Sequence, residues 1–254
     1  MKRVAVLALS ATLLAACDGV VGAKLTYDDT EAVKVTEIVL TGGAADVTVT
    51  TDAVTDGTRI RRIVRGGSEP GPSYTLDGTR LTLGTECQGD CQVSYEIAAP
   101  PGVNVRGELA YGDVSLTGIG TVDVRLTAGD IHVDDAGGPV TLKSGVGDLT
   151  VTGAPSATLT ATTGDLHVRD IAGAVDARTT TGDIDVEMTT AASVTAVSTT
   201  GDVEAIVPGG SYRIRTDTES GDVDVAGRVT NDAKAVNVLD LRTSTGDLSV
   251  TGAP

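Results

Sequence analysis

Residues 164–168 read Gly-Asp-Leu-His-Val, and this pattern recurs along the chain from Gly112 onward. A Gly-Asp pair followed by an aliphatic residue occurs eight times, at spacings of 17, 18, 17, 18, 19, 20 and 25 residues. The pairs begin at Gly112, Gly129, Gly147, Gly164, Gly182, Gly201, Gly221 and Gly246. A nearly constant period of this length predicts a stack of similar structural units.

Each copy also alternates between apolar and polar residues. The first residue after the Asp is aliphatic, the second is polar and the third is again apolar. A second alternating segment precedes each pair, for example Val-Asp-Val-Arg-Leu at residues 122–126. A period of two is typical of strands with one buried face, so each repeat should supply two short strands and two turns.

Two arrangements could join these strands. Successive copies could form antiparallel hairpins in a meander, or equivalent strands could stack in parallel about 4.8 Å apart in a coil. The chain has no Trp, no Phe and only 5 Tyr, which suits the narrow interior of a coil. We therefore predict an all-β fold, a parallel β-solenoid with 17–20 residues per rung. The pattern does not indicate whether each turn has two or three sides.

The Gly-Asp pairs should form the corners of the solenoid. Glycine adopts positive φ without steric cost, and an Asp carboxylate can accept hydrogen bonds from nearby backbone N–H groups. Calcium is the alternative explanation, because stacked carboxylates repel one another unless they are hydrogen-bonded or neutralised. The glycine-rich nonapeptide repeat of calcium-binding β-rolls is absent, so no cofactor is predicted, although the pattern leaves calcium open.

The overall charge excludes some functions. The 254 residues include 35 acidic and 19 basic side chains, a formal net charge of −16. Nucleic-acid binding needs a positive field, so no nucleic-acid partner is expected. With two His and three Cys, the chain offers few ligands for zinc and few partners for a catalytic nucleophile.

The N-terminus has the features of an export signal. Lys2 and Arg3 precede an apolar run over residues 4–14, which is too short to span a bilayer as a helix. Residues 14–17, Leu-Ala-Ala-Cys, resemble the lipobox of bacterial lipoproteins. That resemblance implies a signal peptide over residues 1–16 and acyl chains, such as palmitate, on Cys17. The mature protein would be lipid-anchored on the extracytoplasmic face of the cell membrane; a soluble secreted protein is the alternative.

The mature chain divides into a tether and one domain. We assign residues 17–34 to a lipidated tether and residues 35–254 to the β-solenoid, with an irregular first part (35–103) and regular repeats (104–254). Cys87 and Cys91 flank a turn-forming Gln-Gly-Asp and form an even pair in an oxidising compartment. A small disulfide between them is predicted, and two free thiols are the alternative.

Two columns of stacked side chains are candidate sites. Asp185, Glu204 and Asp224 occupy the same polar position of successive copies, so their repulsion could be relieved by a divalent cation or by His167 one copy earlier. Four residues before the glycines, a largely basic column could contact an anionic glycan or simply face water. Its basic members are Arg125, Lys143, Arg178 and Arg242.

The segment Val-Ser-Tyr-Glu-Ile-Ala-Ala-Pro-Pro-Gly-Val at residues 93–103, followed by the repeats, resembles a known family. It is similar to the bacterial putative-adhesin family of β-strand-repeat domains of unknown function, over roughly residues 35–254. The resemblance implies an extracytoplasmic β-solenoid and supplies no catalytic residues.

Together, these features predict a non-enzymatic, membrane-anchored scaffold or adhesin-like binding surface. Its partner would be an envelope glycan or another surface protein. A β-helix enzyme acting on polysaccharide is one alternative, although the chain lacks the Trp and Phe that often form sugar platforms. A divalent-cation-binding surface module is the other.

Overall fold

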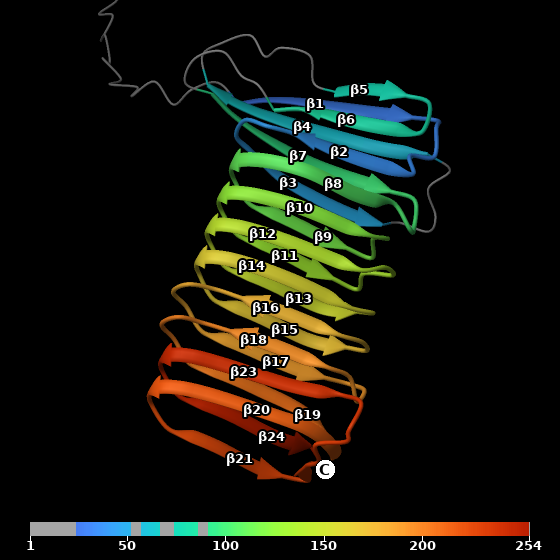
Figure 1. Ribbon diagram of the computed structural model, residues 1–254. Coiled ribbons are helices and arrows are strands. Elements are labelled where there is room, and N and C mark those ends of the chain that lie inside the picture. Colours follow the sequence, from blue (N-terminus) through green and yellow to red (C-terminus); the bar gives the residue numbers. More distant parts are fainter. Residues whose placement is uncertain (1–23, 52–56, 67–73, 86–90, 254) are drawn as a thin grey trace, which may run out of the picture.

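The computed structural model describes residues 24–51, 57–66, 74–85 and 91–253. In these residues the chain forms two long sheets that face each other across an apolar core (Figure 1). The predicted all-β solenoid is confirmed, and each regular turn has two sides, one strand in each sheet. No helix among the described residues is long and apolar enough to cross a membrane.

The strands of each sheet are given in spatial order from one edge to the other. Sheet A contains β1 (Lys24–Glu31), β4 (Thr58–Gly66), β7 (Cys91–Ala99), β3 (Ala45–Thr51), β9 (Val114–Thr117), β11 (Ile131–Asp134), β13 (Leu149–Ala154), β15 (Leu166–Ile171), β17 (Ile184–Met188), β19 (Val203–Pro208), β24 (Leu248–Ala253) and β21 (Val223–Gly227). Sheet B contains β22 (Val229–Asn231), β20 (Gly210–Ser220), β23 (Val238–Thr245), β18 (Val194–Val197), β16 (Val175–Arg178), β14 (Ala157–Thr163), β12 (Val140–Val146), β10 (Val122–Ala128), β8 (Asn104–Tyr111), β2 (Glu37–Thr41), β6 (Arg80–Gly84) and β5 (Tyr74–Asp77).

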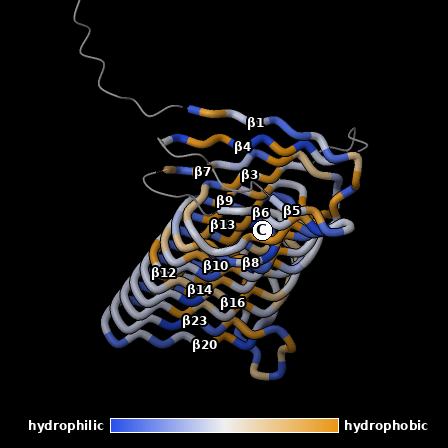
Figure 2. Tube along the Cα trace, turned by 90° about the horizontal axis from the view of Figure 1, so that it is seen from above, coloured by the Kyte–Doolittle hydropathy of each residue, from blue (hydrophilic) through white to orange (hydrophobic). Residues whose placement is uncertain are grey.

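Equivalent residues of successive rungs lie side by side. Leu149 pairs with Leu166, and Val151 pairs with Val168, in a parallel register that repeats along both sheets. The alternation seen in the sequence therefore becomes alternation across each sheet, with apolar residues inside and polar residues outside. Figure 2 shows the alternating hydropathy along the strands. Val186 is only 2% exposed between its neighbours on β15 and β19, as the sequence predicted.

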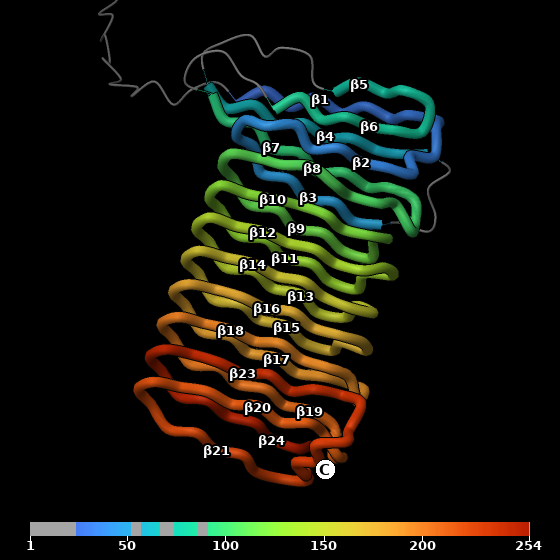
Figure 3. The backbone as a smooth tube through the Cα atoms, viewed as in Figure 1, coloured from blue at the N-terminus to red at the C-terminus, as the bar shows by residue number. Residues whose placement is uncertain are grey.

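The last rungs do not follow chain order. After β19 the chain forms the outermost rung from β20 and β21. It then returns and forms a further rung, β23 and β24, which lies between the outermost rung and the rung of β18 and β19. β24 pairs with β19 on one side and with β21 on the other. In Figure 3 the red tube of β23 accordingly lies between β18 and β20. The repeat predicts that the rungs follow one another in chain order, and that prediction is wrong here.

This order changes the burial of two residues that were expected in the core. Val223 and Val225 carry the apolar alternation of the repeat, but they are 46% and 45% exposed. β21 forms the edge of sheet A, so no further rung covers their side chains. The equivalent residues of β24, Leu248 and Val250, are buried because β24 has neighbours on both sides.

The N-terminal end is built differently. β4 pairs antiparallel with β7 and with β1, and β5 pairs antiparallel with β6, so hairpin strands replace the regular coil. Residues 24–31, which the sequence analysis placed in the tether, form β1 and pair with β4 over their whole length. The Tyr74 hydroxyl donates to Glu31 at 2.6 Å and joins the edge strands of the two sheets.

Candidate binding surface

A ladder of aspartates runs along the corner where each sheet B strand turns into sheet A. Each Asp carboxylate except the last, that of Asp222, accepts a hydrogen bond from the backbone N–H of the Asp on the next rung, at 2.7–3.3 Å. The ladder runs in the order Asp46, Asp113, Asp130, Asp148, Asp165, Asp183, Asp202, Asp247 and Asp222. The predicted structural role of the Gly-Asp pairs is confirmed, and the first acceptor, Asp46, extends the column beyond the eight copies.

The glycine before each Asp allows the rungs to approach closely. Gly147 has φ +139°, and a Cβ atom there would lie 2.1 Å from the carbonyl oxygen of Gly129 on the preceding rung. The buried Ser144 hydroxyl donates a hydrogen bond to the same carbonyl, with 3.4 Å between Ser144 Oγ and the carbonyl oxygen of Gly129. The corresponding hydroxyl of Ser198 donates to Gly182 at 2.9 Å. The corner is therefore held by backbone and side-chain hydrogen bonds.

The outer column of sheet A holds the predicted acidic site. Asp185 lies beside Glu204, but Ser249 of β24 separates Glu204 from Asp224. The prediction that the three acids are consecutive is wrong, because the inserted rung carries a serine at this position. Among the described residues, no group of three or more His, Cys, Asp or Glu side chains could hold a metal ion.

His167 contacts the first of these acids directly. Its Nδ1 lies 3.0 Å from Asp185 Oδ2 on the adjacent strand. His132 is two strands from His167, with Thr150 between them, and its Nε2 lies 2.7 Å from Asp134 Oδ2. The two histidines are therefore engaged separately, each with its own carboxylate.

The basic column on sheet B is interrupted. Arg125 and Lys143 are neighbours, but Thr160 separates Lys143 from Arg178. Arg178 lies 2.8 Å from Asp176 of its own strand, and Arg242 lies 2.7 Å from Asp240. These ion pairs reduce the positive field that an anionic polymer would meet on this sheet.

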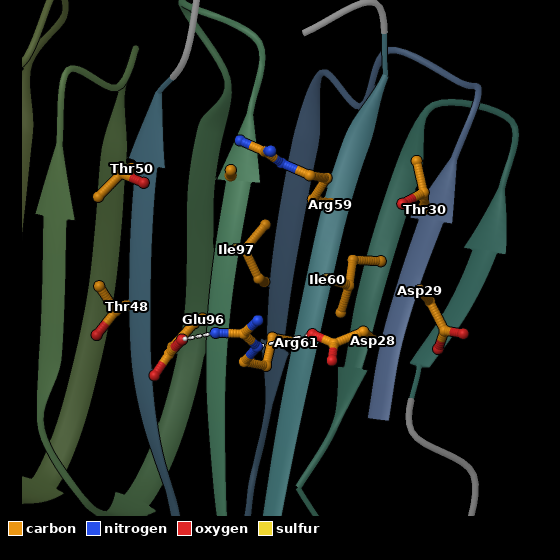
Figure 4. A pocket seen from close by; sticks show the side chains of 11 residues that line it. Asp28, Asp29, Thr30, Thr48, Thr50, Arg59, Ile60, Arg61, Glu96 and Ile97 are labelled. Atoms are coloured by element: carbon orange, nitrogen blue, oxygen red, sulfur yellow. Dashed lines mark hydrogen bonds and ion pairs between the residues drawn. The ribbon is translucent and has the colours of Figure 1, made fainter. Parts of the chain in front are cut away.

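A concavity lies on the outer face of sheet A near its N-terminal edge, with a volume of about 390 Å³. It spans β1, β4, β7 and β3, and Arg61 lies at its centre between two carboxylates (Figure 4). Arg61 Nε is 2.6 Å from Asp28 Oδ1, and Arg61 Nη1 is 3.5 Å from Glu96 Oε2. The hydrogen bond and charge of Asp28, followed by the charge of Glu96, raise the pKa of the Arg61 guanidinium.

The lining of this concavity combines charged groups with hydroxyls. Thr48, Thr50 and Thr30 contribute hydroxyls, and Ala98 is half-buried among them, whereas Ile60 and Ile97 are 2% exposed and belong to the core face of the sheet. Such a surface offers several donors and acceptors at fixed positions. The repeat pattern does not predict this concavity, because its residues lie outside the repeats. The one local signal is the alternation of Arg59 and Arg61 along residues 58–66.

Other predicted site residues lie outside the described part of the chain. Cys17 and Cys87 are both in ranges that the structure leaves undescribed, and Cys91 begins β7. Lipidation of Cys17 and the Cys87–Cys91 disulfide therefore stay predictions.

Comparison with solved structures places the chain among proteins of the same architecture. A crystal structure of a putative adhesin from Bacteroides fragilis matches with a TM-score of 0.54 and 15% identity, covering 90% of this chain and 97% of that one. One from Parabacteroides merdae, also called a putative adhesin, matches with a TM-score of 0.41 and 12% identity, covering 88% and 95%. The first likeness supports the fold.

Comparison by sequence gives the family. Among curated proteins, no sequence matches this chain significantly. The family model described as Toastrack DUF4097 matches residues 88–251, which include all eight Gly-Asp copies and the strand before them. The chain therefore belongs to the Toastrack DUF4097 family.

Proposed function

We propose that this chain is a non-enzymatic lipoprotein of the cell envelope whose solenoid acts as a scaffold with an adhesin-like binding surface. The observation that carries the proposal is the concavity around Arg61, where charged groups and threonine hydroxyls line one hollow on the outer face of sheet A. The names of the structural neighbours, two of them called putative adhesins, support the same reading.

A polyhydroxylated ligand suits this chemistry. Glycan hydroxyls can donate to the carboxylates of Asp28 and Glu96 and accept from the guanidinium of Arg61. We therefore propose an envelope glycan, or a glycan on another surface protein, as the partner.

Binding of the purified chain to an array of bacterial and host glycans tests this proposal. Arg61→Ala should abolish binding, whereas Arg178→Ala should leave it unchanged, since Arg178 is an equally exposed, ion-paired arginine on sheet B. Equal loss in both variants would contradict binding at the concavity. New reducing ends in a bound polysaccharide would favour the alternative, an enzyme that cleaves it.

The membrane anchor has its own test. Cys17→Ser should release the protein from the membrane fraction, because two acyl chains give stable anchoring and their loss removes it. An intact mass showing an unmodified thiol at Cys17 in the wild-type chain would contradict lipidation.

A further inference from the structure

The proposed lipid anchor lies close in sequence to the N-terminal end of the solenoid. β1 begins at Lys24, and six residues separate it from Cys17. A fully extended chain spans at most about 3.6 Å per residue, so Lys24 lies within about 25 Å of an acylated Cys17. Because β1 is the N-terminal edge of sheet A (Figure 2), the acyl chains would hold this end of the solenoid near the bilayer surface.

The start of β1 presents two apolar side chains at this end. Leu25 pairs with Val64 and Tyr27 pairs with Arg62, and both of these β4 residues are buried. Directly paired residues point to the same side of a sheet, so Leu25 and Tyr27 lie on the side that elsewhere faces the core. They are nevertheless 40% and 39% exposed, because none of the described strands lies beyond β1 in sheet A. An apolar surface at the end nearest the anchor is therefore open to contact.

A buried cation holds the Tyr27 ring in place. The guanidinium carbon of Arg62, Cζ, lies 5.0 Å from the centre of the ring. Arg62 is only 5% exposed, and a cation–π contact is stronger when the cation is desolvated. A ring that is already fixed loses little conformational freedom on binding. Tyrosine also combines an apolar ring with a hydroxyl, a combination that is common at the headgroup level of membranes.

Two cations accompany these side chains. Lys24 pairs with Arg65 at the start of β1, and both are exposed. The three carboxylates of the strand, those of Asp28, Asp29 and Glu31, lie farther from the anchor. Since the whole chain has a formal net charge of −16, an anionic membrane repels the chain as a whole but attracts this corner. The charge distribution therefore favours one orientation, with the start of β1 toward the lipid.

We propose that Lys24, Leu25, Tyr27 and Arg65, which we call the β1 patch, dock on the headgroup region of the anionic membrane that holds the lipid anchor. The edge backbone groups of β1 can bond to water there, because water reaches the headgroups although not the hydrocarbon core. β21, at the other edge of the twelve-stranded sheet A, would then lie about 50 Å from the membrane. The proposal rests on the proposed lipid anchor and is independent of glycan binding.

Fluorescence quenching in vesicles tests the contact, because the chain has no Trp and a single introduced one reports alone. The Tyr27→Trp and Val236→Trp variants of the lipoprotein are purified from membranes and reconstituted in vesicles of phosphatidylethanolamine and phosphatidylglycerol that carry nitroxide-labelled headgroups. Val236 is the distal control, since it is 88% exposed and precedes β23 near the opposite end of the solenoid. The fluorescence of Tyr27→Trp should fall at least about twofold, and that of Val236→Trp should change little.

Three outcomes of this measurement would overturn the proposal. The first is equal quenching of the two variants, or quenching of neither. The second is a chain that does not remain with the vesicles, which would refute the anchor as well and is thereby distinguished from a failure of the β1 patch alone. The third is a Tyr27→Trp emission that changes with the number of protein copies per vesicle, which would indicate that a second copy covers β1.

Charge reversal tests the role of the cations. Lys24→Glu with Arg65→Glu, introduced into the Tyr27→Trp chain, should leave its fluorescence within about 10% of the value in quencher-free vesicles. Arg125→Glu with Lys143→Glu is the matched control, because these residues are also an exposed cross-strand pair and the change in net charge is the same. The control should keep the quenching, and thermal melts by circular dichroism check that both double variants fold. Equal loss of quenching in both would show that net charge alone sets the orientation and would contradict docking through the β1 patch, as would quenching that persists after reversal of Lys24 and Arg65.

Discussion

The carboxylate of Asp202 accepts a hydrogen bond from the backbone N–H of Asp247 at 2.7 Å, although the two residues are 45 positions apart in the chain. The Asp that follows next in the sequence, Asp222, instead donates its N–H to Asp247 at 2.8 Å. The ladder thus follows the order of the rungs in space. Each Asp side chain fixes the register of the rung that lies beside it.

The aspartate ladder predicts that alanine substitution of two equivalent aspartates lowers the free energy of unfolding by different amounts. Asp202→Ala removes the acceptor for Asp247 N–H and should lower the free energy of unfolding by about 1 kcal/mol, as loss of a comparable capping side chain does. Asp222→Ala is the matched control, because its carboxylate ends the ladder and has no next-rung Asp to accept from. Urea denaturation of the two variants measures the difference; equal losses would contradict a role for the inter-rung hydrogen bond.

The corner glycines should tolerate no side chain. Gly147→Ala would place a Cβ atom 2.1 Å from the carbonyl oxygen of Gly129 at a positive φ, so the rungs would have to separate. We expect a loss of roughly 3 kcal/mol or more in the free energy of unfolding. Gly137→Ala, whose Cβ would make only an ordinary 3.6 Å contact, should change stability by less than about 0.5 kcal/mol. Similar melting temperatures for both variants would show that the close approach is not required.

The two faces of β17 should respond differently to substitution. Val186→Asp buries a carboxylate among apolar neighbours and should cost several kcal/mol, if the chain folds at all. Asp185→Ser, one residue away on the outer face, should be nearly neutral, since it removes one exposed contact with His167 and one like-charge neighbour, Glu204. Thermal melts compare the two directly, and equal shifts would mean that the faces are assigned incorrectly.

Glu37 should contribute a pH-dependent part of the stability. The hydrogen bonds of Arg106 and Arg80 hold the pKa of Glu37 below its usual value. A carboxyl whose pKa is lower in the folded state stabilises the fold above its unfolded pKa, about 4.3, and this stability is lost as the pH falls through the folded pKa.

Glu37→Gln should therefore be less stable than wild type at pH 7, and the difference should vanish at low pH. Glu187→Gln, on the exposed outer face of β17, provides the charge-matched control and should show little difference at either pH. Denaturation at a series of pH values measures both variants. A wild-type advantage over Glu37→Gln that persists unchanged at pH 2 would contradict the ion-pair explanation.

The regular part of the fold was predictable because its determinants are local. The alternation around Leu166 and Val168 indicates which side chains are buried, and the repeat period indicates which residues of adjacent rungs pair. The order of the last rungs depends on which distant strands pair, and the copies at Gly221 and Gly246 carry the same local pattern. The only signal was indirect, in the longer spacings of 20 and 25 residues.

The N-terminal part and the concavity were less accessible to sequence reasoning. Residues 24–31 were assigned to the tether, but they form β1, and Arg61 of β4 supplies a charge opposite to Asp28 once the two strands pair. Arg61 and Glu96 are 35 residues apart in the sequence. Their side chains come close only because β4 and β7 are antiparallel neighbours. No local sequence pattern in either segment predicts that β4 pairs with β7.

The order of the last three rungs determines the composition of the acidic column, the exposure of Val223 and Val225 and the unpaired edge of β21. Disulfide formation in two double-cysteine variants, mapped by peptide mass, tests this order most directly. Glu204→Cys with Ser249→Cys should cross-link, because adjacent strands lie about 4.8 Å apart, whereas Glu204→Cys with Asp224→Cys should not, at about twice that spacing. A cross-link between positions 204 and 224, without one between 204 and 249, would contradict the inserted rung.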